Sequence, residues 1–101
     1  MTVYKLGGAV LVKAIKMTIS GLVQGVGFRY TAKMLADRLQ VKGIIRNLMN
    51  GDVYIEPQGE EENLKRFVAE IKDSPSPAAR VSNVKISEIN LGDYQDFSVV
   101  F

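Results

Sequence analysis

The sequence predicts an α+β protein in which two helices cover one face of an antiparallel sheet. Three observations lead to this prediction: segments in which apolar and polar residues alternate, two longer segments with apolar residues at helical spacing, and an Asn50-Gly51 dipeptide between two strand-like segments. The length of 101 residues fits one domain with a single core.

The first strand is predicted from Lys13 onward, because Ile15, Met17 and Ile19 alternate with polar residues. Residues 1–11 precede this pattern, and we expect them to form a flexible leader ahead of a domain of residues 12–101. No small-residue cleavage site marks a signal peptide, and no apolar run approaches the roughly 18 residues of a membrane helix. We therefore expect a cytoplasmic protein.

The first helix is predicted after a loop of residues 21–27. Its apolar side chains recur at i, i+4, i+7 and i+11 and form one stripe: Phe28, Ala32, Leu35 and Leu39. Two strands, 44–48 and 52–58, then flank Asn50-Gly51, which is the strongest short-range signal of a hairpin. These two strands should pair with each other.

The second helix is predicted from a run of acidic residues, 60–62, that suits the positive first turn of a helix. Its apolar face is formed by Leu64, Phe67, Val68 and Ile71. The segment 74–77, Ser-Pro-Ser-Pro, ends this helix because proline cannot continue it.

Two further strands are predicted at the C-terminal end. Residues 81–89 read as a strand, and in a short last one Phe97, Val99 and Phe101 alternate with Ser98 and Val100. The resulting order is β-α-β-β-α-β with a short extra C-terminal strand, which is the arrangement of a ferredoxin-like sandwich. This fold supports enzymes, RNA-binding modules and sensors, so function must be argued from a site.

The composition excludes several kinds of site. The chain has no Cys and no His, which removes disulfides, thiol nucleophiles, imidazole bases and most transition-metal sites. Its 13 Lys and Arg exceed its 11 Asp and Glu by only two, far less than a dedicated nucleic-acid-binding protein carries. Any catalysis must therefore depend on other side chains and on the backbone.

The candidate site is the loop from Leu22 to Arg29, which joins a strand to a helix and contains no acidic residue. Gly25 and Gly27 allow backbone N–H groups to turn inward, and the helix start adds its positive dipole end, so an oxyanion would fit. The loop is neither a Walker A motif nor a dinucleotide fingerprint, since Tyr30 stands where the third glycine would be. From these residues alone, a glycine-rich turn without a ligand explains the loop equally well.

Two side chains stand out near this loop. Arg29 is a cation in the first turn of a helix, where it opposes the helix dipole unless an anion is bound, and its planar fork can hold two phosphate oxygens. Asn47 is unusual in a strand whose apolar residues are Ile44, Ile45 and Leu48. The simpler interpretation of Arg29 is a solvated arginine on an ordinary helix. The simpler interpretation of Asn47 is a turn residue beside Asn50-Gly51.

The two segments together resemble the acylphosphatase family. The run from Ile19 to Arg29, Ile-Ser-Gly-Leu-Val-Gln-Gly-Val-Gly-Phe-Arg, is similar to the first signature of that family. The second signature resembles the run Gly43 to Asn47, followed by Gly51, Val53 and Gly59 at the family's intervals. The sequence departs from it at Ile44, where the family usually has an aromatic residue. The resemblance covers about residues 13–101.

The resemblance implies a ferredoxin-like fold and hydrolysis of the carboxyl–phosphate bond of an acyl phosphate, giving a carboxylate and inorganic phosphate. It implies no cofactor and no metal. The phosphate-binding loop would consist of Gln24, Gly25, Val26, Gly27, Phe28 and Arg29. Arg29 would bind the phosphate and Asn47 would position the attacking water. A carboxylate leaves readily without a general acid, which suits a chain without His or Cys.

Two alternatives belong to other classes. Ferredoxin-like sheets also bind RNA through aromatic side chains on their central strands, but Tyr54 is the only aromatic residue in the two predicted hairpin strands and the first strand has none. An acylphosphatase-like domain can also act within a larger assembly, as in hydrogenase-maturation proteins. Because the sequence ends shortly after its last predicted strand, we expect instead a free-standing enzyme. We further expect a monomer that has no nucleic-acid or membrane partner.

Overall fold

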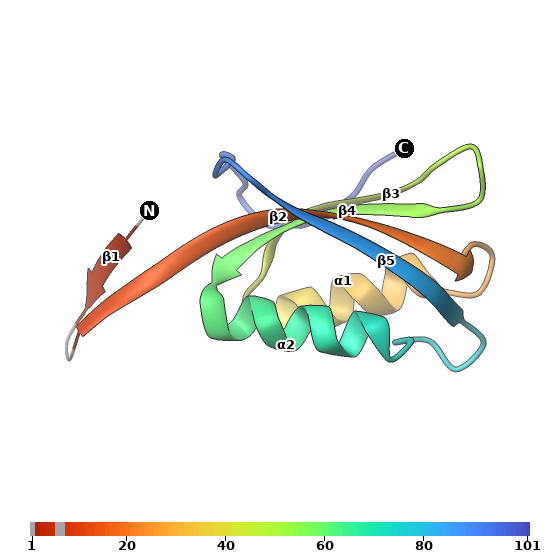
Figure 1. Cartoon of the computed structure of the whole chain (residues 1–101), viewed down its shortest axis with the longest axis horizontal. Coiled ribbons are helices and arrows are strands. Elements are labelled where there is room, and N and C mark those ends of the chain that lie inside the picture. Colours follow the sequence, from red (N-terminus) through yellow and green to blue (C-terminus); the bar gives the residue numbers. More distant parts are fainter. Residues whose placement is uncertain (1, 6–7) are drawn as a thin grey trace.

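Two helices lie side by side under one face of a twisted sheet (Figure 1). The computed structural model describes residues 2–5 and 8–101, with side chains from residue 11 onward. The described strands are β1 (Thr2–Lys5), β2 (Gly8–Leu22), β3 (Lys42–Asn47), β4 (Val53–Glu60), β5 (Arg80–Ile89) and β6 (Phe97–Val99), and the helices are α1 (Phe28–Arg38) and α2 (Glu61–Lys72). From β2 onward the order β-α-β-β-α-β with an extra C-terminal strand is confirmed.

The body of the sheet has the strand order β5-β2-β4-β3-β6. Its neighbours pair antiparallel, except that β6 pairs parallel with β3. The predicted antiparallel sheet is therefore correct for its main strands, while the short last strand adds a parallel edge. No described helix is long and apolar enough to cross a membrane.

The first long strand starts earlier than predicted. β2 begins at Gly8, not Lys13, and its first part pairs with β1, from Thr2 opposite Leu11 to Lys5 opposite Gly8. The segment 9–12, Ala-Val-Leu-Val, has no alternation of apolar and polar residues, so the pattern gave no sign of a strand there. The division into a leader of residues 1–11 and a domain of residues 12–101 stays a prediction.

Smaller differences concern the strand ends. The hairpin strands end at Asn47 and start again at Val53, so the connecting turn is two residues longer than predicted. Within it, the Leu48 amide donates to the Asp52 carbonyl oxygen at 2.8 Å, and Asn50 Oδ1 accepts from the Asp52 amide at 3.0 Å. β6 ends at Val99, and Phe101 lies beyond it.

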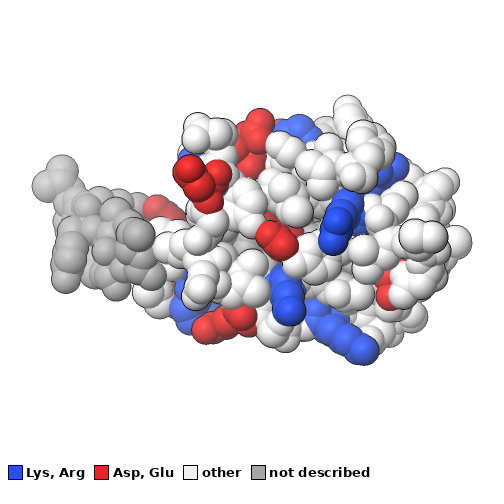
Figure 2. Space-filling view, turned by 90° about the horizontal axis from the view of Figure 1, so that it is seen from above, with Lys and Arg blue, Asp and Glu red and all other residues white. Residues whose placement is uncertain are grey.

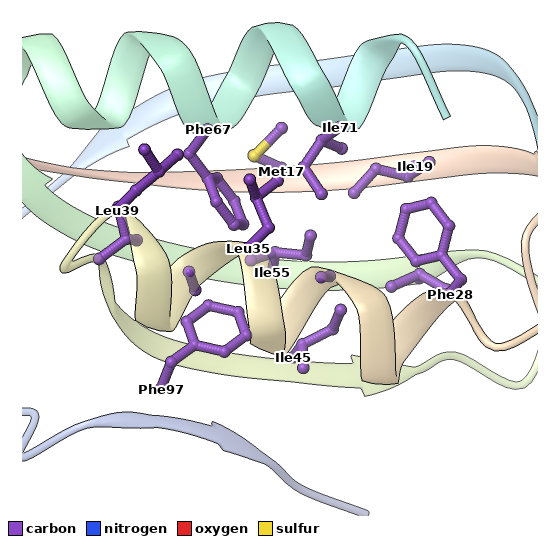
Figure 3. Packing of buried hydrophobic residues seen from close by; sticks show 14 of the residues in the cluster. Met17, Ile19, Phe28, Leu35, Leu39, Ile45, Ile55, Phe67, Ile71 and Phe97 are labelled. Carbon is purple, nitrogen blue, oxygen red and sulfur yellow. The ribbon is translucent and has the colours of Figure 1, made fainter. Parts of the chain in front are cut away.

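The core lies between the helices and the covered face of the sheet (Figure 3). The apolar residues predicted for both helices and for the first strand are buried there, except that Val68 is only partly buried. The largest fully buried side chains include Phe28 from the start of α1, Phe67 from α2 and Phe97 from β6. The rings of Phe67 and Phe97 pack with their centroids 5.8 Å apart, so α2 and the last strand share one core.

The strand directions determine where the candidate residues meet. β2 and β3 are both antiparallel to β4, so they run in the same direction and end at the same edge of the sheet. Val53 of β4 pairs with Ile19 on one side and with Asn47 on the other. The topology therefore brings the loop after β2 next to the end of β3.

Candidate active site

The loop between β2 and α1 is built around two left-handed glycines. Gly25 has φ +74° and Gly27 has φ +77°, a conformation that a residue with a Cβ rarely adopts. A Cβ at Gly25 would have open space around it, so backbone conformation rather than crowding requires glycine there. Successive turns of this kind direct backbone N–H groups toward one side, which suits an anion.

The start of α1 lacks the groups that usually neutralise a helix N-terminus. Gly27 occupies the N-cap position, no side chain caps the helix there, and the first turn contains no acidic residue. The first backbone N–H groups of a helix have no partner within the helix, and the dipole adds partial positive charge. This end of α1 therefore offers both hydrogen-bond donors and a favourable field to an anion.

Two side chains tie the loop to the rest of the protein. Gln24 Nε2 donates to the carbonyl oxygens of Leu48 and Asp52, both at 2.8 Å, which joins the loop to the β3–β4 turn. On the other side, the buried Ser76 donates from its Oγ to the Val26 carbonyl oxygen. The loop is thus held from two directions, so its geometry is set before a ligand arrives.

Arg29 and Asn47 line the same hollow. It has a volume of about 180 Å³, large enough for a phosphate group. The lining residues come from the loop, the first turn of α1 and the end of β3: Val23, Gln24, Gly25, Gly27, Phe28, Arg29, Tyr30 and Asn47. The structure therefore brings together the two side chains that the sequence analysis singled out, although 18 residues separate them.

Asn47 carries an unsatisfied polar atom at this hollow. Its Oδ1 is buried and accepts no hydrogen bond from any residue in the described part of the chain. A buried acceptor without a partner costs free energy, typically about 1–3 kcal/mol, and such groups are rare in proteins. A water molecule that donates to Oδ1 would remove this cost, which is the contact that a water-positioning residue makes.

The side chain of the half-buried Arg29 lies over an aromatic ring. Its Cζ lies 5.3 Å from the centroid of the Phe101 ring, a cation–π contact. No ion pair or side-chain hydrogen bond ties up its guanidinium within residues 11–101, so its donors are free for oxygen atoms of a ligand. The hollow therefore combines backbone donors, one full positive charge and one free acceptor.

Sequence reasoning missed two residues of this arrangement. The sequence pattern places Ser76 in the segment that ends the second helix, and it places Phe101 in the last strand. Neither pattern indicates the contacts that the two residues make. The Ser-Pro repeat gave no sign of a bond to a loop 50 residues earlier. For Phe101, the alternation with Phe97 gave no sign of a contact with Arg29.

The uncovered face of the sheet carries a separate polar cluster. Figure 2 looks down on this face, where basic and acidic side chains are interspersed. Glu56 accepts hydrogen bonds from the hydroxyls of Tyr54, at 2.6 Å, and Tyr94. These bonds lower the pKa of Glu56, and burial together with the bonds to Glu56 raises the pKa of each tyrosine to about 12. A carboxylate at this place is unfavourable for RNA phosphates.

Metal ligands are scarce in the described part of the chain. No group of three or more Asp and Glu side chains there is placed to hold a metal ion. The hollow itself is lined by no acidic residue.

The chain is similar to known proteins over most of its length. The family model described as Acylphosphatase matches residues 15–99. A protein of Ligilactobacillus salivarius named "Acylphosphatase" is 47% identical over 89 residues, which cover 88% of this chain and 99% of that protein. Both matches include the loop, Arg29 and Asn47.

Solved structures agree with these sequence matches. The crystal structure of acylphosphatase from Bacillus subtilis superposes with a TM-score of 0.85 at 34% identity, covering 90% of this chain and all of that one. Full-length HypF, in its phosphate- and nucleotide-bound form, superposes with a TM-score of 0.83 at 32% identity. That match covers 94% of this chain but only 12% of HypF.

Proposed function

Because the chain belongs to the acylphosphatase family, we propose that it hydrolyses the carboxyl–phosphate bond of acyl phosphates without a metal or a cofactor. The observation that carries this proposal is the hollow that Arg29 and Asn47 both line. Within residues 11–101, no side chain pairs with the guanidinium by an ion pair or hydrogen bond, and none donates to the buried Asn47 Oδ1. A phosphate and an attacking water would occupy that space together.

The loop would bind the phosphoryl group. Backbone N–H groups of residues 24–29 and the guanidinium of Arg29 would donate to the oxygen atoms that do not react. In phosphoryl transfer these oxygens carry much of the charge of the transition state, so donors fixed in place stabilise it. The hydrogen bonds of Gln24 and Ser76 support such fixed donors.

Asn47 would hold the nucleophile. A water that donates to its Oδ1 would attack phosphorus while the bond from phosphorus to the carboxyl oxygen breaks and the carboxylate leaves with the electron pair. Asn is not a base at neutral pH, so the proton of the water would pass late to a phosphate oxygen. A carboxylate is a stable anion, so its departure requires no general acid.

A metal-free assay tests this proposal. The protein should hydrolyse acetyl phosphate or benzoyl phosphate in the presence of excess chelator, with inorganic phosphate as a competitive inhibitor. A phosphomonoester should be a far poorer substrate, because its alkoxide leaving group needs the proton that this site does not supply. Loss of activity in chelator, or equal rates on both substrate classes, would contradict the proposal.

Two further parts of the proposal depend on the sequence alone. We propose that the protein is a monomer. We also propose that it lies in the cytoplasm, since the chain has no Cys and no apolar membrane segment. Light scattering during gel filtration would test the first part, and a dimer at micromolar concentration would refute it. Cell fractionation would test the second.

A further inference from the structure

We infer that Phe101 is a positioning residue for Arg29, a role that rests on the proposed function of Arg29 in binding phosphate. The ring of Phe101 would hold the guanidinium at the hollow between α1 and β3. Three features of the structure lead to this inference: the register of β6, its attachment to α1 and the electrostatics of an aromatic neighbour.

The register of β6 directs Phe101 toward Asn47. β6 pairs parallel with β3, with Phe97 opposite Gly43 and Val99 opposite Ile45. The pairing continues past the end of the strand, because the Val100 amide donates to the Ile45 carbonyl oxygen at 2.9 Å. If the same register were extended by two residues, Phe101 would come opposite Asn47.

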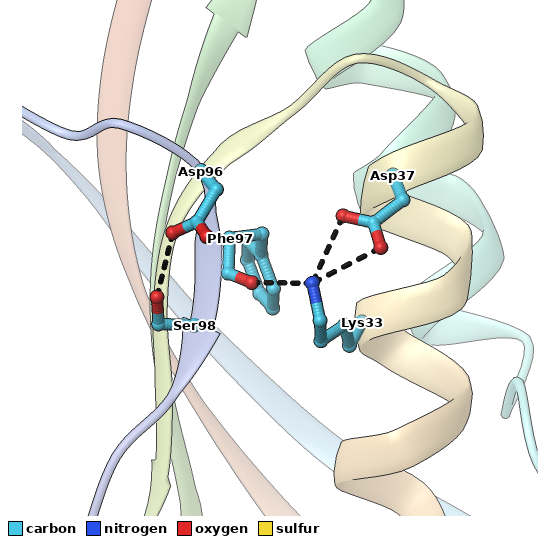
Figure 4. Close-up of polar contacts among 5 residues, drawn as sticks. All are labelled: Lys33, Asp37, Asp96, Phe97 and Ser98. Carbon is cyan, nitrogen blue, oxygen red and sulfur yellow. Dashed lines mark hydrogen bonds and ion pairs between the residues drawn. The ribbon is translucent and has the colours of Figure 1, made fainter.

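The strand is also fastened to the helix that carries Arg29. Figure 4 shows Lys33 Nζ donating to the Phe97 carbonyl oxygen, at 2.7 Å, while it pairs with the carboxylate of Asp37, at 3.0 Å. Arg29 lies one helical turn before Lys33, and Phe101 lies four residues after Phe97. The same face of α1 therefore meets β6 at Lys33 and the end of the chain at Arg29.

An aromatic ring suits this position for an electrostatic reason. A carboxylate beside Arg29 would also hold the guanidinium, but it would compete with the phosphate for its charge and its donors. A ring face attracts the cation without cancelling its charge or occupying its N–H groups. It also limits the rotamers of a long side chain, so less conformational entropy is lost when phosphate binds.

The inference predicts a specific series of variants. Phe101→Leu, which keeps an apolar side chain but removes the ring, should raise the inhibition constant of inorganic phosphate by ~2- to 5-fold, as expected for an exposed cation–π contact. kcat/KM should fall by a similar factor, with kcat changed less. Phe101→Tyr keeps the ring and should behave as the wild type. Ile86→Ala, at an exposed apolar residue of β5, is the matched control and should have no effect.

These measurements distinguish a positioning role from a structural one. Phe101 is fully exposed and outside the core cluster, so the melting temperatures of its variants should stay at the wild-type value while the phosphate affinity changes. The inference is overturned if Phe101→Leu binds phosphate as the wild type does, or if Phe101→Tyr loses affinity as Phe101→Leu does. If Arg29→Ala itself keeps full phosphate affinity, the proposed function of Arg29 fails, and the inference fails with it.

Discussion

The side chain of Gln24 is hydrogen-bonded to the carbonyl oxygen of Leu48, the residue that follows Asn47, at 2.8 Å. A second bond from the same Nε2 reaches the carbonyl oxygen of Asp52, also at 2.8 Å. One amide group thus links the loop that we propose to bind phosphate to the turn after Asn47, the residue that we propose to position the water. The relative placement of Arg29 and Asn47 depends on this link.

Replacement of Gln24 should therefore reduce turnover more than stability. Gln24→Ala removes one of two donors from each of two partly buried carbonyl oxygens, which keep their backbone donors Gly51 and Leu48, so the loss of unfolding free energy should be about 1 kcal/mol or less. Because the loop is then no longer hydrogen-bonded to the turn, Arg29 and Asn47 are less well positioned relative to each other. kcat should therefore fall roughly 10-fold or more. Steady-state kinetics and urea unfolding measure the two effects.

Gln58→Ala is the matched control for this variant. Gln58 also makes two side-chain hydrogen bonds to one distant backbone segment, at Gly92, but it does not line the hollow. Because these two bonds are exposed, Gln58→Ala should lose no more stability than Gln24→Ala, and it should keep its kcat. Equal kcat values for the two variants would show that the Gln24 link has no role in catalysis.

Arg29→Ala and Asn47→Ala should fail in different ways. Arg29 would contact phosphate in both the ground state and the transition state, so Arg29→Ala should abolish turnover and competitive phosphate binding. Asn47 would contact only the water, so Asn47→Ala should keep phosphate affinity while kcat falls by roughly 10² or more. Inhibition constants and kcat, measured on acetyl phosphate, separate the two patterns.

Each of these variants has a control that shares its residue type. Arg38→Ala is the control for Arg29→Ala, because Arg38 lies on the same helix. Asn83→Ala is the control for Asn47→Ala, because Asn83 is an exposed residue of strand β5. Both should keep kcat and phosphate affinity near the wild-type values. The water-positioning role is wrong if Asn47→Ala retains nearly full kcat, or if it loses phosphate binding as completely as Arg29→Ala.

Removal of residues 1–11 should leave kcat within a few-fold of the wild type. The strand pairs of β2 with the body of the sheet begin at Val12 with β4 and at Ala14 with β5, whereas residues 8–11 pair with β1. The deletion therefore removes no pair between the body strands and no residue that lines the hollow. A large loss of kcat in a folded truncation would show that these residues belong to the active domain.

The charged carboxylate of Glu56 should stabilise the folded protein at neutral pH, and this stabilisation should be lost in acid. Hydrogen bonds from Tyr54 and Tyr94 lower the pKa of this carboxyl in the folded state below its ordinary value of 4.5. The stabilisation is therefore present above about pH 4.5 and is lost as the pH falls through the lowered pKa. Glu56→Gln should remove this pH dependence, which urea unfolding between about pH 3 and pH 7 would measure.

Glu62→Gln is the control for this prediction. Its carboxylate lies on the surface of α2 and its nearest cation is Lys65, at 3.7 Å. Such exposed pairs contribute little to stability, so this variant should keep the wild-type pH dependence. If Glu56→Gln also keeps it, the two tyrosine hydroxyls do not stabilise the charged carboxylate.

Local sequence patterns are enough to predict the order of helices and strands in the body of the protein. Alternation around Met17, the stripe from Phe28 to Leu39 and the Asn50-Gly51 turn are local signals, because each depends on the geometry of one element. The glycines of the loop and Arg29 could also be identified from the sequence, because they lie in one short continuous segment. β1 and the start of β2 were not predicted, since the backbone pairing between them requires no particular side-chain pattern.

Contacts between residues far apart in the sequence depend on how the elements pack together. Gln24 bonds to the β3–β4 turn, Ser76 to the loop and Phe101 to Arg29 across separations of 24, 50 and 72 residues, the last from their positions in the chain. The contact of Gln24 arises because β2 and β3 end at the same edge of the sheet. The contact of Phe101 arises because β6 pairs in parallel with β3. No local periodicity encodes them, because they result from how all the elements pack around the shared core.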